Sequence, residues 1–469
     1  MFPKNSLEKK LDVQIATSAL MDNAIQLWMQ MYENTPPWLG GPAHVKSLNL
    51  PSVIAEEFSR LTLTEFAIEL TGSARATFLQ DQLAVMLTNI SNITELWCAL
   101  GGIVLKPFAA GADENGNPDH IELDVVQANR FYPTAFNSNR EVTGAIFVDT
   151  KRIGHYIYTR LEYHSLVGDT YTVLNRAFRS ERLNASVSEN DNINAEHPFA
   201  EEISLEQVDE WKGLQPRVEM HGITHPFFVY IKQPRANTVD PHSPLGTSVY
   251  ARARDQIEEA DRQYSRILWE YEAKETAIDA DETLFETDRS GRPIIPVGKE
   301  RLFRTYDAGS TEKGKFFETF SPEIRDNSLF NGLNNLFRRI EFQCGLAYGT
   351  ISDVNEVEKT AEEIRTSKQR SYATVSAMQT ALEDGLRRLI GVMDTLCTLY
   401  GIVPPGAIET TVTWGDGVLE DTEKEYQRRW NMVLAGKLKL EKFYAWYFGC
   451  TEEAAMELIP QQTQYPVEE

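Results

Sequence analysis

The sequence Gly345-Leu-Ala-Tyr-Gly-Thr-Ile-Ser-Asp-Val-Asn355 separates two strongly helical blocks, and this arrangement decides the fold that we expect. In both blocks apolar residues recur every three or four positions, as they do along one face of a helix. The apolar positions are Leu333, Leu336, Phe337, Ile340 and Cys344 before the interruption, and Ala361, Ile364, Tyr372, Val375, Leu382, Leu386, Leu389, Met393, Leu396 and Tyr400 after it. The pattern predicts two packing helices with a polar break between them.

The second block is unusually long. It runs for about 40 residues without proline, which corresponds to ~60 Å of helix, more than one core helix of an ordinary domain needs. We expect it to serve as a strut in an assembly. Gly385 and Gly391 interrupt this block, and each weakens a helix by about 1 kcal/mol relative to alanine. They predict either bends or close contacts with a neighbouring element.

The flanking sequence alternates between helical and strand patterns, so the fold class that we expect is α+β. Helical patterns cover residues 6–32 and 51–101, the charged stretch Val249–Lys274, and a tail from Asp421 to Phe448 followed by Thr451–Leu458. An antiparallel sheet is predicted from the strands Ile103–Phe108, Ile121–Val126, Ala145–Thr150, His155–His164 and Tyr171–Phe178. A smaller β module is predicted from Ile294–Val297, Arg301–Tyr306 and Lys315–Phe320.

Composition limits the class of protein. The 469 residues suffice for about three domains, and an apolar fraction of 42% supports real cores. The formal charge of −23 argues against ordinary tight binding of nucleic acid, which relies on Lys and Arg, although DNA could still slide past such a protein. No apolar run approaches the ~20 residues of a membrane span, and no secretory signal is evident. We therefore expect the four scattered cysteines to be reduced, mostly buried thiols in the cytoplasm.

One segment imitates a phosphate-binding loop. Gly309-Ser-Thr-Glu-Lys-Gly-Lys315 has the glycine and lysine spacing of that motif, but Phe316 stands where a Mg²⁺-binding Ser or Thr belongs. The residues that follow read as a strand, whereas the motif requires the start of a helix. We interpret the segment as a hairpin turn.

The sequence offers no other defensible catalytic or metal-binding pattern. His155 and His164 are the closest histidine pair of the predicted sheet, and neither has a partner at metal-ligand spacing. Paired acids such as Glu56-Glu57 and Glu362-Glu363 are typical of solvated helix faces. We therefore expect no enzyme activity, no catalytic residues, no metal and no cofactor.

Four segments, taken in their order along the chain, carry a resemblance to a known family. They are Leu48-Asn-Leu-Pro-Ser-Val-Ile-Ala-Glu-Glu57, Asp124-Val-Val-Gln-Ala-Asn-Arg-Phe-Tyr-Pro133, Ser243-Pro-Leu-Gly-Thr-Ser-Val-Tyr250 and Ala347-Tyr-Gly-Thr-Ile-Ser-Asp-Val-Asn-Glu-Val-Glu-Lys-Thr-Ala-Glu-Glu-Ile364. With them the chain resembles the portal proteins of tailed bacteriophages, in particular those of long-tailed phages of Gram-positive hosts. The resemblance covers most of the chain.

The resemblance implies a homo-oligomeric ring, usually of twelve subunits, at one vertex of the capsid, through which DNA is packaged and ejected. It implies the following division of the chain: a wing of helices and antiparallel sheet at 1–245, a stem helix at 246–275, a β-rich clip at 276–321, a second stem helix at 322–345, a tunnel loop at 346–357, a long, kinked wing helix with a return strand at 358–414, and a helical crown with a C-terminal tail at 415–469.

The resemblance also implies roles for particular residues. Those of the DNA-facing tunnel loop are Gly349, Thr350, Ile351, Ser352, Asp353, Val354 and Asn355. Those of the clip, which docks the packaging motor and later the adaptor, are Asp288, Arg289, Arg292, Arg301, Arg304, Lys313 and Lys315. Those of the stem, where neighbouring subunits meet, are Arg254, Glu258, Arg262, Arg266, Arg338 and Arg339.

The partners implied are further copies of the chain, double-stranded DNA, the terminase large subunit, a head-completion adaptor, and the major capsid and scaffolding proteins, with no membrane. The implied location is the portal vertex of the virion, after assembly in the host cytoplasm. Two alternatives stay open from the sequence. One is a capsid-associated structural or scaffolding protein without a channel, and the other is an ATP-driven nucleic-acid motor that uses Gly309–Lys315.

Overall fold

A computed structural model shows the mixed α+β fold that the sequence predicts. It describes residues 2–39, 45–111, 117–181, 199–273, 277–281, 285–286, 303–306, 317–320, 325–353, 361–415, 422–448, 451 and 455–456. The chain forms two compact units, one comprising Met1–Leu63 with Ile68–Val412 and the other Thr64–Ala67 with Thr413–Glu469. Each unit is described by itself.

The chain begins with two helices, α1 (Lys4–Leu11) and α2 (Ala19–Tyr32), so the prediction of a single helix over 6–32 is wrong. The helix stops because Asp12 adopts the left-handed conformation, with φ of +56°. Ser18 then starts the second helix, since its side chain accepts a hydrogen bond from the Met21 amide.

Three helices follow, α3 (Leu50–Thr62), α4 (Ala74–Leu87) and α5 (Ile90–Leu100). The continuous helical pattern predicted for 51–101 is interrupted by strand β1 (Ala67–Thr71), which pairs with β14 (Glu409–Thr413). Local pattern missed β1 because the strand exists only through a partner more than 300 residues away in the sequence.

The strands predicted between 103 and 178 are confirmed, but they belong to two sheets. One sheet has the order β10-β2-β3, and the other has the order β4-β5-β6-β7-β8 with β9 paired to β7. Both are antiparallel. The strand bounds are β2 Gly102–Ala110, β3 His120–Gln127, β4 Phe131–Phe136, β5 Val142–Ile153, β6 Tyr156–Val167, β7 Thr170–Glu181, β8 Glu201–Ile203, β9 Arg217–His221 and β10 Val229–Lys232.

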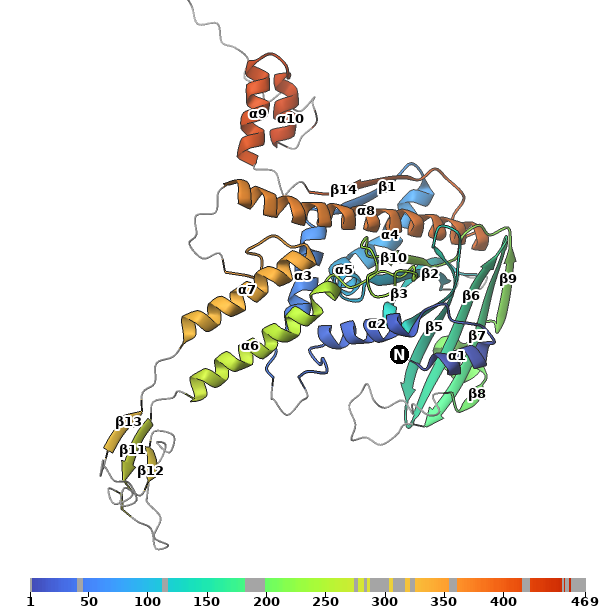
Figure 1. Cartoon of the computed structure of the whole chain (residues 1–469). Coiled ribbons are helices and arrows are strands. Elements are labelled where there is room, and N and C mark those ends of the chain that lie inside the picture. The colour runs from blue at the N-terminus through green and yellow to red at the C-terminus, as the bar shows by residue number, and fades with distance from the viewer. Residues whose placement is uncertain are drawn as a thin grey trace, which may run out of the picture. The chain divides into compact units, whose positions relative to one another are not determined.

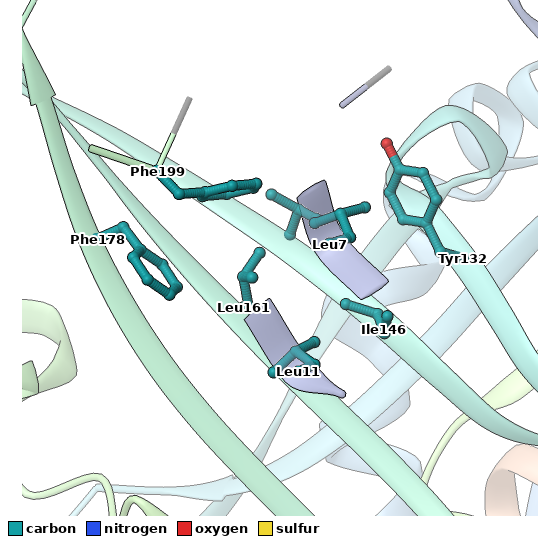
Figure 2. Packing of buried hydrophobic residues seen from close by; sticks show 8 residues of the cluster. Leu7, Leu11, Tyr132, Ile146, Leu161, Phe178 and Phe199 are labelled. Carbon is teal, nitrogen blue, oxygen red and sulfur yellow. The ribbon is translucent and has the colours of Figure 1, made fainter. Parts of the chain in front are cut away.

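Successive residues of a strand point to opposite faces of the sheet. Both faces of the larger sheet are covered by other parts of the chain. Helix α1 packs its buried side chains Leu7 and Leu11 on one face, against Leu161 and Phe178 (Figure 2). On the other face Ala177 packs with Trp211, which lies in the 3-10 turn η3 (Asp209–Trp211), after η2 (Leu205–Gln207).

After a 3-10 turn η4 (Ala251–Ala253), helices α6 (Arg254–Ala273) and α7 (Asp326–Cys344) lie side by side (Figure 1). They run antiparallel, because Arg325 at the start of α7 binds Glu270 near the end of α6. The two helices lie within the ranges 246–275 and 322–345, where the sequence predicts a pair of helices.

A three-stranded sheet lies between α6 and α7 in the sequence. Its order is β12-β11-β13, with β11 (Ala277–Asp281) parallel to β12 (Phe303–Tyr306) and antiparallel to β13 (Phe317–Phe320). The predictions of strands at 301–306 and 315–320 are confirmed over their described residues, β11 was not predicted, and 294–297 lies outside the described residues.

Helix α8 (Ala361–Tyr400) has the 40 residues that the sequence predicts, and it packs against β2 and β10. Its buried side includes most of the predicted apolar positions, with Leu386 and Leu389 fully covered. Tyr372 and Tyr400, which were predicted on the packing face, are 45% and 44% exposed. These residues flank the covered part of the helix.

The two glycines of α8 have different surroundings. A Cβ at Gly385 would lie 2.4 Å from Cδ1 of the buried Ile231, whereas a Cβ at Gly391 would meet nothing within 4 Å. Gly385→Ala should therefore lower the free energy of unfolding by about 2 kcal/mol through overpacking, and Gly391→Ala should raise it by about 0.5–1 kcal/mol. Denaturation midpoints of the two variants check this pair, and equal shifts would contradict the assigned contact.

The second unit contains α9 (Thr422–Leu434) and α10 (Leu440–Phe448), so the single helix predicted for 421–448 is wrong. The chain turns at Gly436, whose φ of +68° suits glycine. Phe443 is the buried aromatic residue between the two helices, with the rings of Tyr426 and Trp430 both 5.3 Å from its own. The short helix predicted for 451–458 lies mostly outside the described residues.

Three cysteines fit the prediction of buried thiols. Cys98, Cys344 and Cys397 are buried and unbridged, and Cys450 lies outside the described residues. Burial raises the pKa of Cys344 to about 12 and that of Cys98 further still. Such thiols remain protonated and unreactive at neutral pH.

Candidate functional site

The expected tunnel loop begins where α7 ends. Gly345 adopts a left-handed conformation with φ of +85°, and its amide donates to the Glu341 carbonyl oxygen at 2.9 Å. The chain then folds back against the helix that it has just left. The described part of the loop ends at Asp353, and the predicted residues Val354 and Asn355 lie outside the described residues.

The side chain of Glu341 anchors the loop. It is fully buried, and its Oε1 accepts hydrogen bonds from the amides of Gly349 (3.1 Å), Ile351 (2.6 Å) and Ser352 (2.8 Å). Its Oε2 accepts the hydroxyl of Ser352 at 2.8 Å. Backbone amides that converge in this way form a nest, which suits a carboxylate.

Two further contacts hold the loop. Asn334 accepts the Asp353 amide at 2.8 Å and donates to the Asp353 carbonyl at 3.2 Å. The Arg370 guanidinium of α8 lies 4.2 Å from the ring centroid of Phe342 and 5.8 Å from that of Tyr348. The loop is thereby attached to α7 at two points and contacted by α8 at a third.

The loop presents some of the predicted residues and conceals one. Gly349, Thr350 and Asp353 are exposed and Ile351 is half-buried, but Ser352 is buried. The expectation that Ser352 faces DNA is therefore corrected, because its hydroxyl donates to Glu341 inside the loop. Sequence reasoning missed the anchors. A signal was present, since Asn334 and Glu341 are two helical turns apart and share one side of α7.

The charged residues predicted for the stem divide into two groups. On α6, Glu258 binds Arg262 at 2.7 Å and Arg254 at 3.6 Å, and Arg266 binds Glu259 at 3.0 Å. These exposed pairs within one helix contribute little stability. On α7, Arg338 and Arg339 form no ion pair with any residue that the structure describes.

Most of the residues predicted for the clip lie outside the part of the chain that the structure describes. Asp288, Arg289, Arg292, Arg301, Lys313 and Lys315 lie outside the described residues, and Arg304 is described only by its backbone in β12. The phosphate-loop candidate Gly309–Lys315 lies there too, but a strand, β13, begins at Phe317. A phosphate loop requires a helix at that position, so β13 favours the interpretation as a turn.

A cavity of about 840 Å³ lies between the two antiparallel sheets, and the sequence did not predict it. Its wall carries Lys106, Arg160 and Glu162, with the Glu162 carboxylate 2.8 Å from Lys106 and 3.2 Å from Arg160. Asp149 and Asp124 also line it, and Asp124 binds Lys106 at 3.3 Å. These charges of both signs pair with one another.

A chain of hydrogen bonds leads from this cavity into the core. His164 lies 2.6 Å from Glu162 and 2.5 Å from the hydroxyl of Tyr171, which accepts the Phe227 amide at 3.0 Å. The hydroxyl proton of Tyr171 is therefore free to bind Nδ1 of His164, and Nε2–H can donate to Glu162. This series of hydrogen bonds ends at the fully buried Tyr171 and not at an exposed nucleophile.

These contacts set the protonation of the pair. Burial lowers the pKa of His164, an effect that Glu162 opposes. Burial by itself would raise the pKa of Glu162, but Lys106 together with His164 and Arg160 holds it well below its usual value. At neutral pH the imidazole is therefore neutral and the carboxylate is ionised.

The stability of the chain should consequently fall in mild acid. Burial holds the pKa of folded His164 below the ordinary histidine value of about 6.5, so the unfolded chain takes up a proton first as the pH falls through that value. The free energy of unfolding then falls by up to about 1.4 kcal/mol per pH unit for this one proton. Glu162 adds nothing between pH 7.5 and 5.5, because the stability that its lowered pKa contributes is lost only once the pH falls below the ordinary pKa of an unfolded glutamate, about 4.3. Denaturation at pH 7.5 and 5.5 should show a smaller loss for His164→Gln than for the wild type, and equal losses would contradict this account.

Among the described residues, no group of three or more His, Cys, Asp or Glu side chains could hold a metal ion. Within the same residues no single helix is long and apolar enough to cross a membrane, and α4 and α5 pass on length and composition only as a pair bent by 64°. No protein-family model matches the chain, and no curated protein matches it significantly.

Proposed function

We propose that the chain is a portal protein: a ring-forming subunit whose central channel carries DNA into and out of a capsid, and which docks the packaging motor and the tail adaptor. The observation that carries the proposal is the sequence of elements from α6 to α8. A hairpin of two helices with a small sheet inserted between them leads through an anchored polar loop into a 40-residue helix. This order corresponds to the stem, clip, tunnel loop and wing helix of that family.

The charge of the chain supports a conduit. With a formal charge of −23 per chain, a ring of identical subunits surrounds its axis with negative potential, and such a wall repels phosphates. DNA then moves through the channel without adhering, since tight binding would require cations that displace counterions. Thr350 and Asp353, the exposed polar side chains of the loop, place hydroxyl and carboxylate groups at its surface rather than cations.

The stem supports contact between neighbouring subunits. Arg338 and Arg339 of α7 form no ion pair with any described residue, while α6 carries exposed carboxylates such as Asp255 and Glu259. In a closed ring the two faces of a subunit meet different faces of its neighbours. We assign α7 of one subunit to α6 of the next, with the guanidinium groups facing these acids.

In this proposal the three-stranded sheet β11–β13 is the clip that contacts the terminase large subunit during filling and the head-completion adaptor afterwards. The capsid and scaffolding proteins contact the outer part of the ring. ATP hydrolysis belongs to the terminase. The strand that follows Gly309–Lys315 agrees with this division, because it leaves that segment without the helix of a phosphate loop.

The mass of the purified protein tests the proposal. Native mass spectrometry should give a single closed oligomer of about twelve chains of 53.3 kDa. A monomer at high concentration, or a ladder of unlimited size, would contradict the ring and favour a capsid-associated protein without a channel. ATP turnover by the chain alone that Lys315→Ala abolishes would instead favour a motor.

A further inference from the structure

We infer that Glu341 is a positioning residue that makes residues 345–353 a fixed part of helix α7. The inference rests on the proposed function only where it concerns DNA. The contacts themselves belong to the chain, because four donors of the loop converge on one buried carboxylate.

Because of where Glu341 lies, its buried carboxylate depends on the loop for hydrogen-bond donors. Glu341 is in the last turn of α7, where the partial charge of the helix end is negative and disfavours a carboxylate. No basic side chain among the described residues forms an ion pair with it. Its compensation comes from the amides of Gly349, Ile351 and Ser352 and from the Ser352 hydroxyl. Opening the loop would leave a buried carboxylate without partners, which is strongly unfavourable.

The other contacts have the same consequence. Asn334, two helical turns before Glu341 on α7, forms two hydrogen bonds with the backbone of Asp353. The Gly349 amide also donates to the Ser352 hydroxyl oxygen at 3.2 Å. The exposed residues Thr350 and Asp353 are therefore presented at set positions relative to α7. When α7 moves, this part of the loop moves with it as one body.

Hydrogen exchange of the full-length protein, followed by mass spectrometry over residues 346–353, tests the inference. Glu341→Ala should exchange this segment at least a hundredfold faster than the wild type. Glu341→Gln should exchange it less than tenfold faster, since the three amides all bind Oε1, which the Gln carbonyl oxygen can replace. Glu219→Ala, at an exposed carboxylate of strand β9, is the matched control and should leave the rate unchanged.

Unchanged exchange in Glu341→Ala would overturn the inference. Should that variant fail to fold, Ser352→Ala replaces it, since it removes the hydroxyl that donates to Glu341 and accepts the Gly349 amide, and unchanged exchange in that variant would overturn the inference equally. A second readout concerns DNA: rings of Glu341→Ala should package less DNA than wild-type rings, and Glu341→Gln should restore packaging. Normal packaging despite accelerated exchange would overturn the role towards DNA. Wild-type protein that forms no ring would count against the proposed function and leave the exchange result to decide the role of Glu341.

Discussion

Arg75→Met is expected to lower the free energy of unfolding of the larger unit by about 3 kcal/mol, among the largest effects of any single change in the chain. Arg75 lies in the first turn of α4 and is only 1% exposed. Denaturant titrations of wild type and variant measure the effect as a shift in midpoint at equal slope.

The reason is the number of groups that this guanidinium joins. It donates to the Asp394 carboxylate at 2.7 Å, to the Thr398 hydroxyl at 2.7 Å, and to the carbonyl oxygens of Val403 and Pro404. Methionine retains most of the volume but no donor, so these acceptors lose their partner. The link between α4 and the end of α8 is lost with them.

Arg388→Met is the matched control for Arg75→Met. Arg388 lies on α8 and, like Arg75, pairs with an acid, Asp384, but the two side chains are 39% and 68% exposed. An exposed pair of this kind is worth little, so the expected loss is below about 0.5 kcal/mol. Similar losses in the two variants would contradict the structural role assigned to Arg75.

The second large effect concerns DNA. If the proposed portal function holds, Asp353→Lys should reduce the DNA packaged per assembled ring at least tenfold while the ring still forms. The Asp353 side chain is exposed, and the contacts of this residue to Asn334 use its backbone, so the substitution preserves the loop. In a ring, one lysine per subunit would place a circle of cations against the DNA phosphates and retain the DNA by counterion release.

Salt and two control variants separate this explanation from damage to the fold. The packaging defect should weaken as the salt concentration rises, because screening reduces the attraction. Asp353→Asn should package nearly normally, and so should Glu219→Lys, which changes the same charge on the exposed strand β9. Equal packaging by Asp353→Lys and the wild type would remove Asp353 from the channel wall.

Periodicity predicted the elements whose stability comes from their own apolar faces. The 40-residue helix, the helices α6 and α7, and the strands between 103 and 178 all followed from local pattern. Predictions failed where partners are distant in the sequence. Strand β1 forms only by pairing with β14. The strands expected to form one sheet lie in two sheets, because tertiary packing decides which strands pair.

Helix ends were missed where a single residue breaks a continuous apolar pattern. Asp12 stops α1 and Gly436 separates α9 from α10, each with a positive φ that periodicity does not register. At the candidate site, the sequence located the loop but not what holds it. In the sequence Glu341 does not differ from other acids on a helix, because its burial depends on the amides of residues 349–352, which converge on its side chain only in the folded chain.

Electron microscopy of the purified protein tests whether the chain forms a ring around a channel. We expect closed rings of one size with a central hole, and a reconstruction in which residues 349–353 from every subunit line that hole next to the end of α7. Particles without a hole, open filaments, or rings in which these residues face outward would contradict it.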